Sequence, residues 1–201
     1  MIAVIDYGAG NLFSVCNALT YLNIAHEVTK NADAINRADA VILPGVGAFP
    51  AAMESLHATG LVETIRENAA KKPLLGICLG MQMLFDKSNE NGDCAGLSLI
   101  PGEVRRIPSQ RVIIPHMGWN ELVITQECKL LDGIEKPVYT YFVHSYQAFC
   151  DDRNIVAYAD YDGKVPALVT DGKYVFGAQF HPEKSGEKGL QMLRNFERMA
   201  K

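Results

Sequence analysis

The stretch PLLGICLGMQ, residues 73–82, decides the fold that this sequence predicts. Its first six residues form a short apolar run, typical of a strand buried on both faces of a parallel sheet. A helix is expected from residue 79 onward, and glycines at 76 and 80 flank Cys78 at the junction. A cysteine between two glycines, where a buried strand gives way to a helix, has the pattern of a nucleophile elbow. The stretch therefore predicts both a parallel sheet and a reactive thiol at the end of one strand.

The chain before this stretch alternates between strand-like and helical patterns. Apolar runs predict strands, and they lie at 2–6, 24–29 and 40–43. Residues 12–22 carry apolar side chains at helical spacing, and two further helical patterns follow a glycine-rich turn, the later one at 61–69. Strands that alternate with helices indicate a parallel sheet with helices on both faces.

The second half of the chain has a different pattern, because turns rather than helices separate its strand-like runs. These runs lie at 112–114, 121–125, 138–143, 155–160, 165–169 and 174–180. They predict an antiparallel extension of the sheet, and a last helix is expected after Ser185. The predicted fold class is therefore α/β, with a twisted, mixed, mostly parallel central sheet flanked by helices on both faces.

Length and composition limit the classes of protein that fit. The 201 residues, 48% hydrophobic and 21% charged, suit a single globular domain over 1–201 rather than a disordered chain. The net charge is −4 and no basic stripe is present, so nucleic acid is not an expected partner. No apolar stretch approaches the ~20 residues that span a bilayer, so we expect no membrane association and a cytoplasmic protein. The five cysteines are too widely spaced for a disulfide ladder or a paired zinc site.

His181 is the best candidate for the base that a nucleophilic Cys78 requires. The proline that follows favours an extended backbone at His181, and residues two apart in an extended segment project to the same side. Glu183 can therefore orient the imidazole, which gives a Cys–His–Glu triad. A His-x-Glu pair also suits a metal ion, but no second cluster of ligands has convincing spacing, so no metal site is predicted.

Two glycine-rich turns follow predicted strands. Acyl transfer through a tetrahedral oxyanion requires fixed N–H donors. The backbone of Leu79 can supply one, and the turn that contains Val46 and Gly47 can supply another, although an ordinary strand-to-helix turn is the alternative. The other turn, GAG at 8–10, begins like a dinucleotide-binding fingerprint, but Phe13 stands where the third glycine belongs, and we expect no such cofactor.

Three segments taken together resemble the triad-type, or class I, glutamine amidotransferases over nearly the whole chain. They are PGVG at 44–47, GICLGMQ at 76–82 and QFHPE at 179–183. The resemblance implies hydrolysis of glutamine to glutamate and ammonia through a cysteinyl thioester, on a twisted mixed sheet flanked by helices, and it names no cofactor.

The resemblance also assigns roles to individual residues. Cys78 looks like the nucleophile, His181 like the general base and acid, and Glu183 like its orienting carboxylate. The oxyanion hole would be formed by Leu79 and the 45–47 turn. The implied substrate contacts are Gly45, Gln82, Ser145 and Tyr146.

Further segments resemble one subfamily, the glutaminase subunits of imidazole glycerol phosphate synthase. They are GAGN at 8–11, PHMGWN at 115–120, YFVHSY at 141–146 and the Lys-Ser pair at 184–185. Met81, where many relatives that serve other synthases have histidine, favours the same subfamily. The likeness implies a heterodimer in histidine biosynthesis, in which ammonia passes through a channel to a separate (β/α)₈ barrel cyclase. Its implied docking residues are Asn11, Trp119, Asn120 and Lys184.

Alternatives to this interpretation remain open from the sequence. The chain could serve another synthase, or it could be a stand-alone cysteine hydrolase or redox-sensing protein of similar fold. A degenerate relative that only scaffolds a synthase is a further alternative, against which the intact Cys78, His181 and Glu183 argue.

Overall fold

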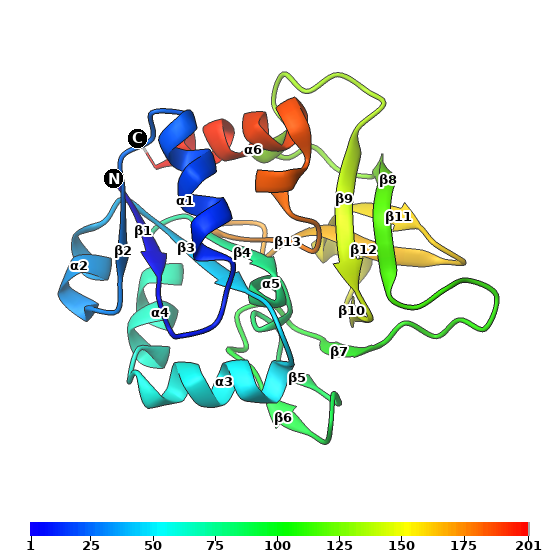
Figure 1. Cartoon of the computed structure of the whole chain (residues 1–201), viewed down its shortest axis with the longest axis horizontal. Coiled ribbons are helices and arrows are strands. Elements are labelled where there is room, and N and C mark those ends of the chain that lie inside the picture. Colours follow the sequence, from blue (N-terminus) through cyan, green and yellow to red (C-terminus); the bar gives the residue numbers. More distant parts are fainter. Residues whose placement is uncertain (201) are drawn as a thin grey trace.

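Residues 1–200 are described by a computed structural model, shown in Figure 1. The first half of the chain supplies β1 (Ile2–Ile5), α1 (Leu12–Tyr21), β2 (His26–Thr29), α2 (Ala32–Arg37), β3 (Ala40–Gly45), α3 (Phe49–Ala58), α4 (Val62–Ala69), β4 (Leu74–Cys78), α5 (Leu79–Gln82), β5 (Lys87–Ser88) and β6 (Cys94–Ala95). The second half supplies β7 (Glu103–Arg106), β8 (His116–Ile124), η1 (Lys129–Leu131), β9 (Tyr139–His144), β10 (Tyr146–Phe149), η2 (Asp152–Asn154), β11 (Ile155–Asp160), β12 (Lys164–Thr170), β13 (Val175–Ala178), η3 (Pro182–Lys184) and α6 (Gly186–Met199). No helix within these residues is both long and apolar enough to cross a membrane.

The main sheet combines a parallel half with an antiparallel half. Its strand order within residues 1–200 is β2-β1-β3-β4-β13-β12-β11-β8-β9. Neighbours from β2 to β13 pair in parallel, and neighbours from β13 to β9 pair antiparallel. The predicted fold class, a mixed sheet with an antiparallel extension, is therefore confirmed.

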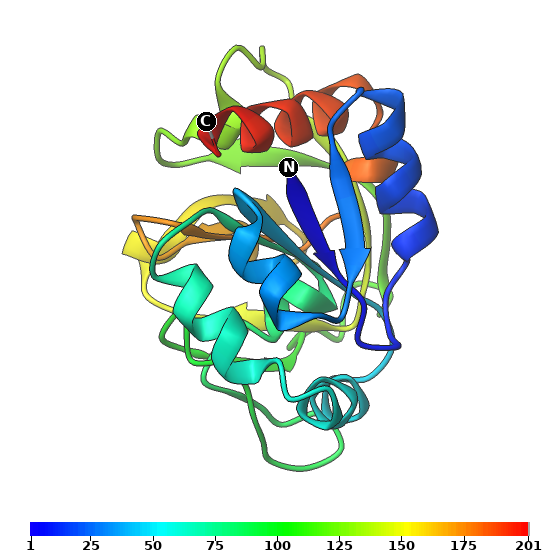
Figure 2. The same cartoon turned by 90° about the vertical axis from the view of Figure 1, so that its left-hand side faces the viewer.

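Helices cover both faces of this sheet (Figure 2). On one face α1 and α6 contribute Val15, Leu19 and Leu193 to an apolar core. On the other face α3 and α4 contribute Phe49 and Ile65 to a second core. The parallel strands β1, β3 and β4 are buried along their whole length because both of their faces are covered.

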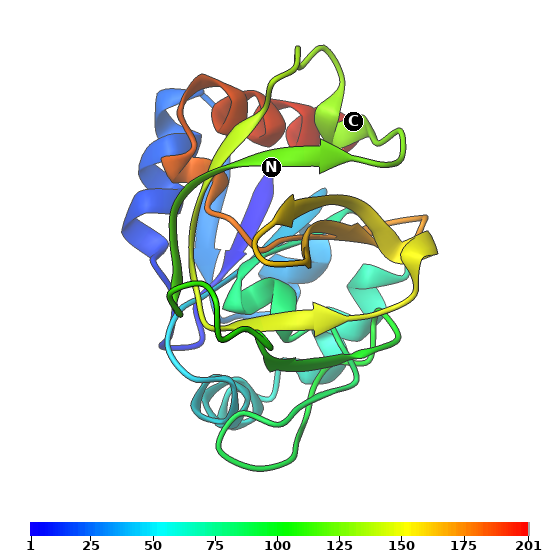
Figure 3. The ribbon, with the colours of Figure 1, turned by 90° about the vertical axis from the view of Figure 1, so that its right-hand side faces the viewer.

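Part of the second half differs from the pattern that the sequence predicted. Residues 112–114 form no strand, whereas β8 begins at His116, well before the predicted run at 121–125. A small second sheet, in the order β10-β7-β5-β6, was also missed, and Figure 3 shows β10 beside β7. Its strands have two to four residues, too few for an alternating pattern to be recognised.

Three glycines allow α5 to pack directly against the backbones of β3 and β4. A Cβ atom at Gly80 would lie 1.9 Å from the carbonyl oxygen of Leu43, and one at Gly45 would lie 2.5 Å from the amide nitrogen of Gly80. A Cβ atom at Gly76 would lie 2.6 Å from the carbonyl oxygen of Gly80. The helix therefore contacts the strands backbone to backbone, as the elbow pattern requires.

We expect Gly80→Ala to destabilise the fold by about 3 kcal/mol or more, because neither backbone can move aside without breaking the sheet. Urea unfolding followed by circular dichroism would measure the loss. Gly60→Ala is the matched control, since a Cβ there meets nothing within 4 Å. That control should cost only about 1 kcal/mol, from the positive φ of residue 60. Equal losses in the two variants would contradict the backbone contact as the cause.

Candidate active site

Cys78 occupies a strained turn at the carboxyl end of β4. Its φ is +55° and its ψ is −112°, in a region that residues other than glycine rarely adopt. Such strain persists only where the surrounding structure enforces it, and it is concentrated at functional sites. The contact between α5 and the two strands enforces it here, so the thiol is held at a fixed point beyond the sheet.

His181 reaches the same place from the neighbouring strand. Because β13 pairs with β4 in parallel, with Ala178 opposite Ile77, the segment after β13 leaves the sheet beside Cys78. His181 Nδ1 lies 2.8 Å from Glu183 Oε1, and the Glu183 side chain is fully buried. The sequence predicted that Glu183 orients the imidazole of His181, and the two side chains are in hydrogen-bond contact. Glu183 Oε2 is buried without a hydrogen-bond partner.

The environment of His181 favours its protonated form. Burial by itself lowers the pKa of His181, but the hydrogen bonds and charges of Cys78 and Glu183 outweigh it and raise the pKa to about 9. A protonated imidazole places a positive charge beside the sulfur of Cys78. This pairing is the one that a cysteine nucleophile requires.

The stability of a Glu183→Gln variant should depend on pH. Because the pKa of His181 is raised from 6.5 to about 9, its protonation stabilises the fold fully below pH 6.5, and this contribution is lost as the pH rises through about 9. Removing the Glu183 charge weakens that contribution. We therefore expect the variant to be less stable than the wild type at about pH 6, with a difference that shrinks by about pH 10. Urea unfolding at both pH values measures it.

The control for this pH series is Glu187→Gln, which removes an exposed carboxylate from the first turn of α6. It should show no comparable trend. A stability difference for Glu183→Gln that stayed constant across the range would show that Glu183 does not act through the charge of His181.

The glycine-rich turn after β3 lies beside the elbow, because β3 and β4 pair with Gly45 opposite Cys78. Val46 and Gly47 border the same cavity as Leu79. Gly47 has a φ of +96°, and a Cβ there would meet nothing within 4 Å. The residues predicted as oxyanion donors are thus grouped around Cys78, in a turn that has space to change conformation.

A cavity of about 360 Å³ connects these groups. Its lining includes most of the predicted site residues, namely Val46, Gly47, Cys78, Leu79, Gln82, Ser145, Tyr146 and His181. Gly45 and Glu183 are the exceptions among the predicted catalytic, oxyanion and substrate residues. Gly45 packs against Gly80, and the fully buried Glu183 side chain reaches the site only through its hydrogen bond to His181. The lining also includes Glu90, Pro115 and Val143, to which the sequence assigned no role, and His144, a candidate for the pocket wall from the segment at 141–146. Glu90 stands in a hydrophilic stretch without periodicity, so no sequence signal marked it.

Comparison with known proteins places the chain in a family. The family model for glutamine amidotransferase class-I matches residues 3–199. The chain belongs to this family. Two relatives, each called imidazole glycerol phosphate synthase subunit HisH, come from Bacillus thuringiensis subsp. konkukian and Bacillus anthracis (strain A0248). Each is 53% identical to this amidotransferase, over 98% of this chain and 93% of the relative.

Solved structures show the same amidotransferase fold at low sequence identity. A crystal structure described as a glutamine amidotransferase is 19% identical, with a TM-score of 0.77 over 100% of this chain and 99% of its own. A glutamine amidotransferase from Thermotoga maritima is 17% identical, with a TM-score of 0.69 over 100% of this chain and 97% of its own.

Gln82 and Gln179 form a buried hydrogen-bonded pair in this amidotransferase. The side-chain amide of Gln82 donates to the carbonyl oxygen of Tyr146 and to Gln179 Oε1, both at 3.0 Å. Both amide hydrogens of Gln82 are therefore used, and only its carbonyl oxygen is left for a ligand. Gln179 Nε2 in turn lies 3.9 Å from Cys78 Sγ. Gln179 was part of the motif, but no sequence signal indicated that it contacts the thiol.

The four predicted docking residues lie outside the cavity lining. Trp119 is 57% exposed and so does not anchor a core, and Lys184 is exposed as well. Asn11 is half-buried and caps α1, where its side chain accepts from the amide of Ser14. Asn120 is half-buried between β8 and β11, and it contacts the carbonyl oxygen of Asp160.

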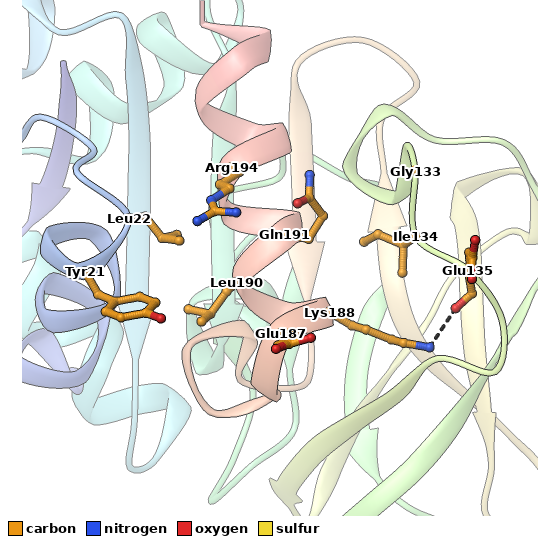
Figure 4. Close-up of a pocket in the computed structure, with 10 residues that line it drawn as sticks. All are labelled: Tyr21, Leu22, Gly133, Ile134, Glu135, Glu187, Lys188, Leu190, Gln191 and Arg194. Carbon is orange, nitrogen blue, oxygen red and sulfur yellow. Dashed lines mark hydrogen bonds between the residues drawn. The ribbon is translucent and has the colours of Figure 1, made fainter.

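A second cavity of this amidotransferase, about 420 Å³, lies between α1, α6 and the loop before β9 (Figure 4). Figure 4 shows Lys188 turned toward Glu135, whose carbonyl oxygen its ammonium group contacts at 2.7 Å. The lining contains no cysteine or histidine. It therefore offers neither a thiol nor an imidazole. Within residues 1–200 no group of three His, Cys, Asp or Glu side chains could hold a metal ion.

Proposed function

We propose that this amidotransferase is the glutaminase subunit of imidazole glycerol phosphate synthase, which releases ammonia from glutamine for a separate cyclase subunit. The observation that carries the proposal is 53% identity, over nearly the full length of both chains, to subunits that bear this name. Cys78 and His181 line one cavity, and Glu183 is hydrogen-bonded to His181, which supports the proposal with the chemistry that the reaction needs.

In the first half of the reaction, the sulfur of Cys78 attacks the side-chain amide carbon of glutamine. The carbonyl oxygen becomes an oxyanion, which the backbone N–H of Leu79 and one from the 46–47 turn stabilise. The C–N bond then breaks, and the protonated His181 gives its proton to the leaving nitrogen. Ammonia leaves, and a thioester to Cys78 remains.

Water completes the reaction. His181, now neutral, takes a proton from a water molecule as this water attacks the thioester carbon. The second tetrahedral intermediate expels the sulfur of Cys78 as thiolate and releases glutamate. Glu183 keeps the imidazole in the orientation that serves both halves, because it accepts from Nδ1 and leaves Nε2 as the nitrogen that transfers protons.

Charged and polar groups around the cavity suit the rest of the substrate. Glu90 is an acidic residue on the lining and can hold the α-ammonium group of glutamine. The free carbonyl oxygen of Gln82 and the Ser145 hydroxyl are further candidate contacts, with Tyr146 and Gly45 shaping the wall and floor. We also propose a cytoplasmic location, which the likeness to a biosynthetic subunit supports.

Release of glutamate from glutamine tests the proposal. The chain would be assayed alone, with a barrel cyclase subunit, and with that subunit plus its nucleotide substrate. Release that requires the cyclase, together with imidazole glycerol phosphate formation, is the expected result. Hydrolysis that ignores the cyclase would indicate a stand-alone hydrolase, and an absence of hydrolysis in all three mixtures would refute a glutaminase.

A further inference from the structure

Two buried histidines, one of them in the cavity lining, take no part in the chemistry proposed above. His116 on β8 and His144 at the end of β9 lie directly opposite each other in the antiparallel pair. Both are at least 94% buried, and His116 Nδ1 lies 3.1 Å from His144 Nε2. The His116 ring is stacked between Phe142 and Tyr161, with centroid distances of 4.5 and 3.9 Å. Packing on both faces therefore fixes the plane of this ring.

The hydrogen bonds of this pair can run in only one direction. His144 Nδ1 lies 2.8 Å from the carbonyl oxygen of Tyr146, which can only accept, so Nδ1 of His144 carries the hydrogen. Burial lowers the pKa of His144 to about 3 and that of His116 to about 4, so both rings are neutral near pH 7. A neutral ring has one donor and one acceptor. His144 Nε2 is therefore an acceptor.

The hydrogen positions of His116 follow from those of His144. Its partner nitrogen, Nδ1 of His116, has to donate, which leaves Nε2 of His116 as an acceptor. The side-chain amide of Asn120 lies 3.4 Å from that nitrogen and supplies the donor. The series of hydrogen bonds therefore runs from Asn120 through both rings to the Tyr146 carbonyl, and each donor in it faces an acceptor.

The inner end of this relay lies at the substrate cavity. The Tyr146 carbonyl oxygen accepts from His144 and also from Gln82, so two donors hold it in place. Gln82 and Tyr146 both line the cavity, and the other amide hydrogen of Gln82 is bound to Gln179. A shift of the Tyr146 carbonyl would therefore turn the Gln82 amide, whose carbonyl oxygen is its remaining group for a ligand.

We propose that His116 and His144 are positioning residues that hold the Tyr146 carbonyl and the Gln82 side chain in the orientation that binds glutamine. They act as a relay of fixed hydrogen-bond direction, with Asn120 as its outer end. The proposal rests on the proposed function, since it concerns how the same site binds its substrate. It assigns the pair to substrate binding and not to the chemical step.

The first test is kinetic and uses the complex with the cyclase subunit. His144→Leu removes the donor to Tyr146 and should raise the KM for glutamine about 3- to 10-fold, the effect of one lost hydrogen bond, with kcat within about twofold of wild type. His144→Asn can place an amide donor where Nδ1 stands, so its KM should stay within about twofold of wild type. His116→Phe keeps the ring stack and removes both ring nitrogens, and it should raise KM about threefold.

Tyr161→Phe is the matched control, because it keeps the stack on His116 and removes only the hydroxyl contact to the Ile113 carbonyl. It should leave KM unchanged. Equal KM values for His144→Leu and His144→Asn would overturn the proposal, as would a loss confined to kcat. Thermal unfolding of each variant shows whether it folds. If His144→Leu does not fold, the KM values of His116→Phe and Tyr161→Phe test the proposal instead, and equal values would overturn it.

The second test needs no activity, so it separates failure of this proposal from failure of the proposed function. Imidazole ¹⁵N shifts of the uniformly labelled chain should show two neutral rings that carry hydrogen on Nδ1, assigned by their absence in His116→Phe and His144→Asn. Hydrogen on Nε2 in either ring would overturn the relay even if the enzyme is an active glutaminase. A wild-type complex without glutaminase activity would instead overturn the proposed function.

Discussion

A Cys78→Ala variant is expected to keep its fold and lose glutamine hydrolysis by at least about 10⁴-fold, because the nucleophile and its base act as one unit. It should also lose labelling by a glutamine-like electrophile. Cys150→Ala is the matched control, since Cys150 does not line the cavity and burial raises its pKa to about 11. Activity retained by Cys78→Ala, with labelling at another residue, would end the assignment of the nucleophile.

The same variant separates ammonia supply from cyclisation. If ammonia is the only chemical product that this chain gives its partner, the Cys78→Ala complex should still form imidazole glycerol phosphate from ammonium salts at alkaline pH. If this complex fails to cyclise where the wild-type complex succeeds, the chain has a further chemical role.

The second large effect concerns the free chain, which we expect to hydrolyse glutamine about 10²- to 10³-fold more slowly than the complex with cyclase and nucleotide. This is the cost of one missing oxyanion donor. The positive φ of Gly47 and the space around it allow the 46–47 turn to hold its N–H away from the oxyanion. Binding of the partner would then shift the turn toward the active conformation.

Turnover of the free chain, the complex, and the complex with nucleotide measures this switch. Full activity of the free chain would refute it. Lys184→Ala and Asn11→Ala test the docking face in the same assay, and unchanged affinity for the cyclase in both would remove these residues from it. Because Asn11 caps α1, Asn11→Asp serves as its control, since aspartate keeps the cap and changes only the exposed chemistry.

The features that the sequence predicted are those set by neighbouring residues. The elbow at Cys78 depends on two glycines within two positions, and the contact between His181 and Glu183 depends on one proline between them. Both signals are local, so they can be recognised without knowledge of the fold. The pairing of β4 with β13, which come from opposite halves of the chain, then brings the two motifs together.

The features that the sequence did not reveal depend on distant contacts. Glu90 reaches the cavity because its carboxylate binds the amide of Phe49 at the start of α3, a contact between residues 41 positions apart. The relay from Asn120 to Tyr146 depends on the register of β8 with β9. The contact between Gln179 and Cys78 depends on the pairing of β13 with β4. No periodicity or motif encodes such pairings, because they are set by tertiary packing.

The direct contact of α5 with β3 and β4 has a consequence for how mutations spread through this enzyme. Main-chain atoms at the elbow touch one another without side chains between them, so the place of the sulfur does not depend on how well the apolar cores are filled. A smaller side chain at Leu19 or Ile65, one in each core, would lower stability but leave the nucleophile where it is. Substitutions in the cores should therefore leave the turnover per folded molecule unchanged. Most of them should instead reduce the amount of folded protein.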